Sequence, residues 1–147
     1  MININLLTKL LRTKHWVKNL FIFLPLFFSG ELFNSIKLIN TFYVILSFSL
    51  VASFIYIIND IFDIEFDKIH PEKRNRPIAS GKISIKQSLS LGFCFLSLGL
   101  IVLWNVSYNS FLLTILYVIL NFCYSLKLKH IPIVDFILPL SSLIVLP

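Results

Sequence analysis

Two long uncharged runs constrain this chain more than any other feature of its sequence. Residues 38–59 carry no charged side chain over 22 positions, and residues 87–126 carry none over 40. One helical crossing of a bilayer needs about 20 apolar residues, and 40 helical residues extend about 60 Å, which is two hydrocarbon thicknesses. The polar residues Asn105, Ser107, Asn109 and Ser110 interrupt the longer run midway. We therefore expect this run to form a helical hairpin.

The composition agrees with a membrane protein. The 147 residues are 57% hydrophobic and 14% charged, which excludes a disordered chain. Apolar segments cover residues 15–28, 38–58, 87–104, 111–126 and 131–147. The fold expected is all-α, a polytopic transmembrane helical bundle with about five spans. Because the last segment ends inside an apolar run, we expect residues 1–147 to be a partial transmembrane domain, truncated at its C-terminus.

The basic residues predict the orientation of this bundle. In a topology that alternates between spans, 12 of the 13 basic residues fall on one side, and only Lys37 falls on the other. The positive-inside rule makes the richer side the cytoplasm. Topology thus explains most of the net charge of +6. We expect no nucleic-acid partner, because the sequence contains no basic and aromatic module typical of such proteins.

Four of the seven acidic residues lie within eight positions after the second apolar segment: Asp60, Asp63, Glu65 and Asp67. On one helix continuing to Asp67, Asn59 and the three aspartates share a face, whereas Glu65 points elsewhere. Three carboxylates on one stripe repel one another unless a cation lies between them. Oxygen ligands at this spacing suit Mg²⁺, which commonly binds one or two carboxylates together with substrate phosphates.

Basic residues follow this acidic segment directly. Lys73, Arg74 and Arg76 provide three cations in four positions, and guanidinium and ammonium groups both bind phosphate oxygens. Carboxylates for a metal next to cations for phosphate predict a diphosphate site. The alternative is a solvated helix end followed by ordinary topological charge. A second cluster, with Tyr124 and Lys129, could close the same site or serve only as an interfacial anchor.

Residues 59–67 follow the pattern N-D-x-x-D-x-x-x-D, and residues 73–81 follow K-R-x-R-P-I-A-x-G. With these two motifs the sequence resembles the UbiA-type membrane prenyltransferase superfamily. Residues 14–19 and 124–130 resemble the branch of decaprenyl-phosphate phosphoribosyltransferases, with His15 in place of that branch's usual glutamine. The resemblance covers nearly all of this chain but only the N-terminal half of the superfamily's fold.

This resemblance implies a larger bundle, with two aspartate-bearing helices facing each other across Mg²⁺ and a diphosphate. No second acidic motif is present in the chain, so a second chain could supply the missing half. The implied protein is an integral, multi-pass protein of a bacterial-type inner (plasma) membrane, with its active-site loops in the cytoplasm.

The reaction implied is phosphoribosyl transfer from phosphoribosyl diphosphate to a polyprenyl phosphate, with diphosphate leaving. The alternatives are prenyl transfer from a polyprenyl diphosphate to an aromatic acceptor, and an inactive or non-catalytic membrane fragment. Asp60 and Asp63 would be catalytic. The metal ligands would be Asn59, Asp60, Asp63 and Asp67. The substrate-binding residues would be Lys18 and Asn19 for the lipid phosphate, Lys73, Arg74, Arg76 and Lys129 for other phosphates, and Tyr124 for a phosphate or the ribose.

Overall fold

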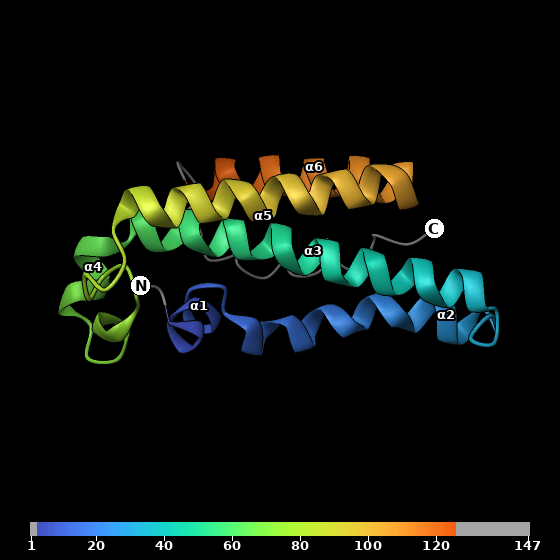
Figure 1. The fold of residues 1–147 in the computed structure, drawn as a ribbon, viewed down its shortest axis with the longest axis horizontal. Helices are drawn as coiled ribbons and strands as arrows, with labels where there is room; N and C mark the ends of the chain where they lie inside the picture. Colours follow the sequence, from blue (N-terminus) through green and yellow to red (C-terminus); the bar gives the residue numbers. More distant parts are fainter. Residues whose placement is uncertain (1–2, 126–147) are drawn as a thin grey trace.

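The computed structural model describes residues 3–125, and every regular element in that range is a helix (Figure 1). The elements, in chain order, are α1 (Ile4–Leu10), the 3₁₀ helix η1 (Thr13–Phe23), α2 (Leu24–Phe28), α3 (Ser35–Phe62), α4 (Ile64–Ile69), the 3₁₀ turn η2 (Lys73–Asn75), α5 (Ile85–Val106) and α6 (Tyr108–Cys123). The all-α prediction is thus correct for the described residues. The expected fifth segment, residues 131–147, lies outside them.

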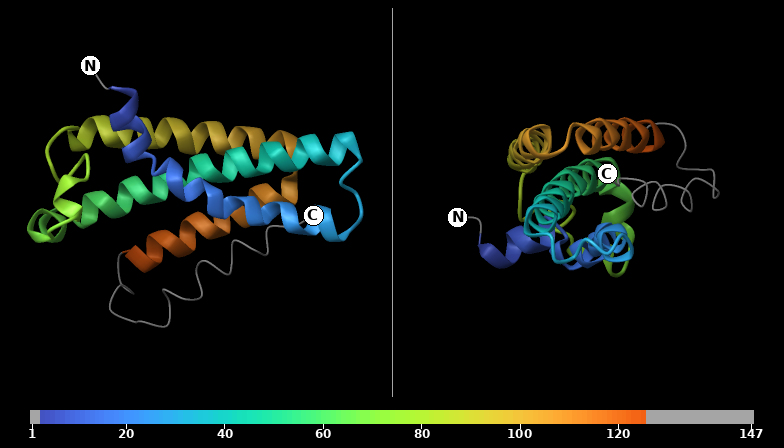
Figure 2. Two further views of the ribbon diagram at one scale, coloured as in Figure 1. Left: turned by 90° about the horizontal axis from the view of Figure 1, so that it is seen from below. Right: turned by 90° about the vertical axis from the view of Figure 1, so that its right-hand side faces the viewer.

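Helix α3 forms the centre of the bundle. It lies between the segment η1–α2 on one side and the pair α5 and α6 on the other (Figures 1 and 2). Its side chains are mostly buried from Val44 to Asp60, and they contribute to three apolar clusters. This central position explains why nearly every residue type on α3 is apolar or small.

The first apolar segment reaches farther than its length suggests, because most of it is a 3₁₀ helix. At about 2.0 Å per residue, the 11 residues of η1 extend about 22 Å, and α2 adds about 8 Å. The sum is close to the roughly 30 Å hydrocarbon core. The change to α geometry occurs at Leu24, next to Pro25, which occupies the first turn of α2, where a missing N–H is tolerated.

Hydrogen bonds fix η1 against α3. The indole Nε1 of Trp16 donates to Ser53 Oγ at 3.0 Å, and the Asn19 amide donates to Ser49 Oγ at 2.8 Å. The two serines are four residues apart and therefore share one face of α3. The Ser53 hydroxyl also donates to the carbonyl oxygen of Leu11 at 2.9 Å.

Small residues bring α5 close to α3. Ser88, Gly92 and Gly99 are buried on the face of α5 that packs against α3. A Cβ atom at Gly99 would lie 2.8 Å from the backbone oxygen of Ser47 and 2.8 Å from a methyl carbon of Val51. Such small residues allow close packing of membrane helices, where packing replaces the hydrophobic drive available in water.

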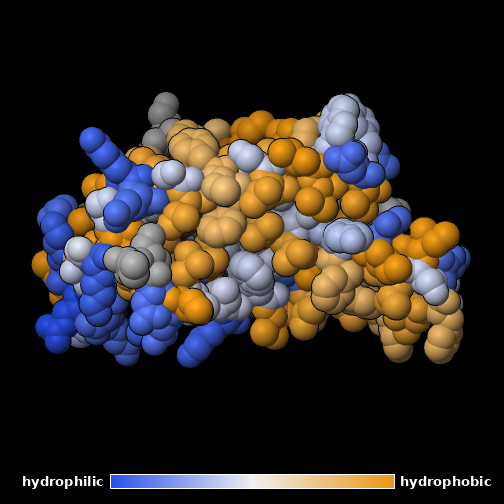
Figure 3. Space-filling view, in the orientation of Figure 1, coloured by the Kyte–Doolittle hydropathy of each residue, from blue (hydrophilic) through white to orange (hydrophobic). Residues whose placement is uncertain are grey.

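The hairpin predicted for the 40-residue run is present. Helix α5 ends at Val106, Ser107 is extended and caps α6 through its hydroxyl, and α6 runs back along the bundle (Figure 1). Within residues 3–125, two helices, α3 and α5, are long and apolar enough to cross a membrane, and α6 is a shorter apolar helix. Apolar residues cover much of the visible surface along the bundle, whereas hydrophilic ones gather at the α4 end (Figure 3).

The hydrophilic residues 70–84, between α4 and α5, form a returning segment that folds back onto the bundle. Ile78 and Ile83 are buried in a cluster with Leu10, Leu11 and Ile57. The turn between the two isoleucines uses Gly81, whose φ of 71° lies in the left-handed region that favours glycine. This anchoring holds the basic residues next to the end of α3 that is predicted to face the cytoplasm.

Candidate active site

The acidic segment is not one continuous helix, which corrects our prediction. Helix α3 ends at Phe62, and α4 begins at Ile64. Between them Asp63 adopts φ −97° and ψ 5°, outside the helical range. Helical i→i−4 hydrogen bonds nevertheless continue on both sides, because Asp63 N donates to Asn59 O and Asp67 N donates to Asp63 O. The break redirects the chain without separating Asp60 from Asp67.

Two aspartates and two arginines form a partly buried ion network at this end of the bundle. Arg76 Nη1 contacts Asp60 Oδ1 at 3.0 Å and Asp67 Oδ2 at 2.7 Å, so one nitrogen joins both carboxylates. Arg12 Nη2 contacts the same Oδ1 of Asp60. The carboxylates are almost fully buried, at 2% and 3% side-chain exposure, and the arginines are 22% and 25% exposed. Burial of these charges is tolerated because each has a partner.

Arg12 reaches Asp60 from the junction between α1 and η1. Its backbone adopts φ 51° and ψ 44°, an uncommon conformation for a residue with a side chain. The guanidinium also lies 4.9 Å from the centre of the Tyr56 ring, which is one turn before Asp60 on α3. In the sequence, Arg12 is one of the 12 basic residues on the predicted cytoplasmic side, and no motif assigns it to the site. The one signal available was indirect, namely that a buried acidic residue requires a cationic partner.

Arg76 is positioned by its neighbours in the returning segment. Pro77 and Ile78 are buried directly after it, and its backbone N–H bonds the carbonyl oxygen of Lys73 at 2.9 Å. Ser80 N in turn donates to the Arg76 carbonyl oxygen at 2.9 Å. The apolar anchor and these turns point the side chain to the end of α3.

The C-terminal end of α6 also approaches this site. The Ser125 hydroxyl donates to the side-chain oxygen of Asn59, next to Asp60. Tyr124, next to Ser125 in the chain, therefore lies at the same end of the bundle as the aspartates. The sequence motifs assigned no role to Ser125. Lys129, predicted to bind phosphate there, lies outside the described residues.

The remaining predicted site residues are distributed around this network. Lys73 and Arg74 are exposed in the returning segment, and Asp63 is half-buried between α3 and α4. Lys18 is exposed on η1, while Asn19 bonds α3 through Ser49. Glu65 is exposed and pairs with Lys68 at 2.8 Å, as expected for a residue on another face.

The donor set near Arg76 fits a divalent cation such as Mg²⁺. Oxygens of Asp60 and Asp67 already converge on a single cationic nitrogen, and the Asn59 amide oxygen is adjacent in sequence. Oxygen ligands of this kind, few in number and completed by phosphate, are typical of Mg²⁺ sites. Among the described residues, no three acidic, histidine or cysteine side chains are arranged to hold a metal by themselves. Substrate oxygens would therefore have to complete the coordination.

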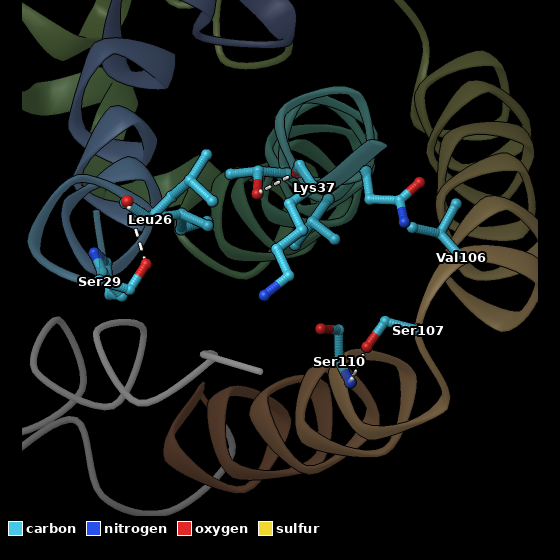
Figure 4. A pocket seen from close by; sticks show the side chains of 11 residues that line it. Leu26, Ser29, Lys37, Val106, Ser107 and Ser110 are labelled. Carbon is cyan, nitrogen blue, oxygen red and sulfur yellow. Dashed lines mark hydrogen bonds between the residues drawn. The ribbon is translucent and has the colours of Figure 1, made fainter. Parts of the chain in front are cut away.

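A separate pocket of about 390 Å³ lies at the opposite end of the bundle. It lies between α2, the start of α3 and the turn from α5 to α6, and the Lys37 side chain extends into it (Figure 4). Lys37 also pairs with Glu31 at 3.0 Å, and none of the described lining residues is acidic. The pocket therefore does not belong to the ion network.

Residues 19–145 match the UbiA prenyltransferase family, and the chain belongs to that family. Its members are polytopic membrane proteins, generally Mg²⁺-dependent, so this chain is an integral membrane protein of a transferase family. The resemblance inferred from the sequence motifs is thereby confirmed.

Three relatives illustrate the range of the family. The decaprenyl-phosphate phosphoribosyltransferase of Mycolicibacterium smegmatis is 30% identical over 143 residues, covering 95% of this chain and 45% of the relative. The digeranylgeranylglyceryl phosphate synthase of Sulfurisphaera tokodaii is 39% identical over 74 residues, covering 50% of this chain and 26% of the relative. The uncharacterized protein y4nM of Sinorhizobium fredii is 34% identical over 125 residues, covering 85% and 24%. The chain thus spans less than half the length of each.

Proposed function

We propose that this chain forms the N-terminal part of a Mg²⁺-dependent transferase that moves a phosphoribosyl group from phosphoribosyl diphosphate to a polyprenyl phosphate. The observation that carries this proposal is the convergence of Asp60 and Asp67 on one cationic nitrogen beside a basic segment. Similarity to a decaprenyl-phosphate phosphoribosyltransferase over 95% of the chain supports the phosphoribosyl group and the polyprenyl phosphate acceptor. The site would face the cytoplasm.

The carboxylates of Asp60 and Asp67 would hold the metal ion, with Asn59 and Asp63 as further ligands. A bound Mg²⁺ would neutralise the charge that develops on the diphosphate as its bond to the ribosyl carbon breaks. Lys73, Arg74 and Arg76, and with them Lys129, would bind phosphate oxygens and orient the donor. Fixed cations placed where charge develops lower the barrier without reorganising during the reaction.

The acceptor needs less from the protein. A polyprenyl phosphate is already an anion, so its attack on the ribosyl carbon does not require a strong general base. Lys18 and Asn19, on the first span, would guide the lipid phosphate, while Tyr124 would hydrogen-bond a phosphate or the ribose. The apolar surface along the bundle would accommodate the polyprenyl chain within the membrane (Figure 3).

Prenyl transfer from a polyprenyl diphosphate is the second candidate. The digeranylgeranylglyceryl phosphate synthase is 39% identical over 74 residues, half of this chain, and the same metal and diphosphate chemistry would serve both donors. In that reaction the acceptor would be an aromatic compound.

The two candidates differ in which donor is consumed. Membranes containing the complete gene product should be incubated with Mg²⁺ and polyprenyl phosphate, together with either ribose-labelled phosphoribosyl diphosphate or a labelled polyprenyl diphosphate. We expect the ribose label to enter the lipid extract, and chelation of Mg²⁺ to prevent this. Labelling of an aromatic acceptor from the polyprenyl diphosphate, with no transfer of ribose, would favour the second candidate.

Residues 1–147 expressed alone provide a further arm of this assay. The described carboxylates come from one segment of chain, so other groups would have to complete the coordination of the metal ion. We expect this piece to insert into membranes and to transfer neither group, and transfer to return when a chain with a second acidic motif is co-expressed. Turnover by residues 1–147 at the rate of the complete protein would contradict this expectation.

A further inference from the structure

Asp60 and Asp67 already have cationic partners within the chain. Arg76 Nη1 lies within 3.0 Å of an oxygen from each, and Arg12 contacts the same oxygen of Asp60. A metal ion bound by these two carboxylates would occupy the position that Arg76 Nη1 takes in the structure. Metal and guanidinium therefore compete for the same oxygens.

The charges of the network make binding of the metal ion alone unfavourable. The four side chains carry two negative and two positive charges, and both carboxylates are buried to at least 97%. A divalent cation entering alone would displace the guanidinium groups and leave two cations without partners near a site of low polarity, which is unfavourable. A diphosphate group entering with the metal would provide new anionic partners for both arginines.

We propose that Arg12 and Arg76 are internal counter-ions of the metal-binding aspartates, so that the metal ion and the diphosphate enter this site together rather than separately. The proposal rests on the function proposed above, because it takes Asp60 and Asp67 as metal ligands. The arginines pair with carboxylates in the empty protein and with phosphate oxygens in the loaded one. The arginines therefore weaken the binding of the metal ion alone and strengthen its binding together with diphosphate.

The partly exposed position of Arg76 makes this exchange feasible. Its side chain is 25% exposed, and it belongs to the returning segment beside Lys73 and Arg74, which are themselves exposed. The guanidinium can thus turn from the carboxylates toward a ligand over the end of α3. Its anchor residues Pro77 and Ile78 remain buried and need not move.

The test measures Mn²⁺ binding to the complete protein in lipid nanodiscs by electron paramagnetic resonance, before any diphosphate or other soluble phosphate compound is added. In the variant Arg76→Gln we expect Mn²⁺ to bind about tenfold tighter, within the range typical of coupled sites. Inorganic diphosphate, titrated at saturating Mg²⁺, should bind about tenfold weaker. Arg12→Gln should shift both affinities in the same directions.

Two further variants separate this role from others. Arg76→Lys keeps a cation that can occupy the position of Nη1, so its affinity for Mn²⁺ alone should remain as low as that of the unmodified protein. Lys82→Gln removes an exposed cation of the same segment and should change neither affinity. If Arg76→Gln lowers the affinity for Mn²⁺ alone as well as the affinity for diphosphate, the role of Arg76 is structural and the proposal is wrong.

An unchanged affinity for Mn²⁺ alone in Arg76→Gln would also overturn the proposal, since it would make Arg76 a phosphate ligand only. The function proposed above would survive that result if the protein still consumed its donor. If the unmodified protein binds neither Mn²⁺ nor diphosphate, even when both are present, the proposed function fails together with this inference.

Discussion

Asp67 gives the most specific residue-scale prediction, because the exposed Glu65, two positions before it, is a matched control. In the complete enzyme, Asp67→Asn should lower turnover by about 10²-fold or more, since it removes a ligand charge where leaving-group charge develops. Glu65→Gln should have a small effect, because Glu65 is 82% exposed and contacts only Lys68 among the pairs described. Turnover with labelled donor, measured on both variants in membranes, checks this.

The two variants must be compared at equal amounts of folded protein. Asp67 is buried and paired with Arg76, so its replacement can also lower stability. Monodispersity in detergent distinguishes the two effects. Equal loss of turnover at Glu65 and Asp67 would show that the acidic residues do not divide by face as described.

At this scale the helical spacing predicted that Asp60 and Asp67 lie on one side, but not which cations pair with them. Asp63, predicted on the same face, lies at the break between α3 and α4. Asp60 and Asp67 are seven residues apart, so local helical geometry brings them to one side even though the helix breaks at Asp63. The contact from Arg12 joins residues 48 positions apart and depends on a left-handed backbone conformation at Arg12. No local pattern encodes such a contact.

Close packing of α5 on α3 is the main contact between long helices in the bundle. Gly99→Ala should lower the free energy of unfolding by about 1–3 kcal/mol, because its Cβ would clash with backbone as well as a side chain. The gain in helix propensity, at most about 1 kcal/mol, does not offset this. Thermal unfolding of the protein in detergent measures the difference.

Gly92→Ala is the matched control on the same helix. Its Cβ would lie 3.1 Å from Phe54 Cδ2 and 3.5 Å from Ile57 Cδ1, both side-chain atoms that can shift. We expect a change near zero, since the propensity gain opposes the modest crowding. If Gly92→Ala destabilises the protein more than Gly99→Ala, the assigned helix contact is wrong.

The elements themselves were largely predictable from charge and hydropathy. The uncharged runs predict α3, α5 and α6, and the polar cluster midway predicts the turn at Ser107. The 3₁₀ geometry of residues 13–23 was not predictable, because it depends on bonds from Trp16 and Asn19 to serines of α3. Tertiary contacts, rather than local propensity, select that geometry.

The ion network lies at the α4 end of the bundle and the Lys37 pocket at the α2 end. These two helices lie at opposite ends of the fold (Figure 1). The partition of basic residues predicts that the site end is cytoplasmic. In a protein without Cys94 and Cys123, single cysteines at Phe33 and Lys82, both exposed, should react with a membrane-impermeant reagent from opposite faces of sealed vesicles. Reaction of both from the same face would contradict the topology.

The account of the whole molecule depends on the metal and the diphosphate meeting at Asp60 and Asp67. The most direct measurement is electron-nuclear double resonance of Mn²⁺ with ³¹P in the complete protein, loaded with inorganic diphosphate. We predict a coupling between Mn²⁺ and phosphorus in the unmodified protein. The affinity of the protein for Mn²⁺ with diphosphate should fall at least tenfold in Asp60→Asn and Asp67→Asn and remain unchanged in Glu65→Gln. The same coupling and affinity in all three variants would mean that the metal is held elsewhere, which would contradict the account.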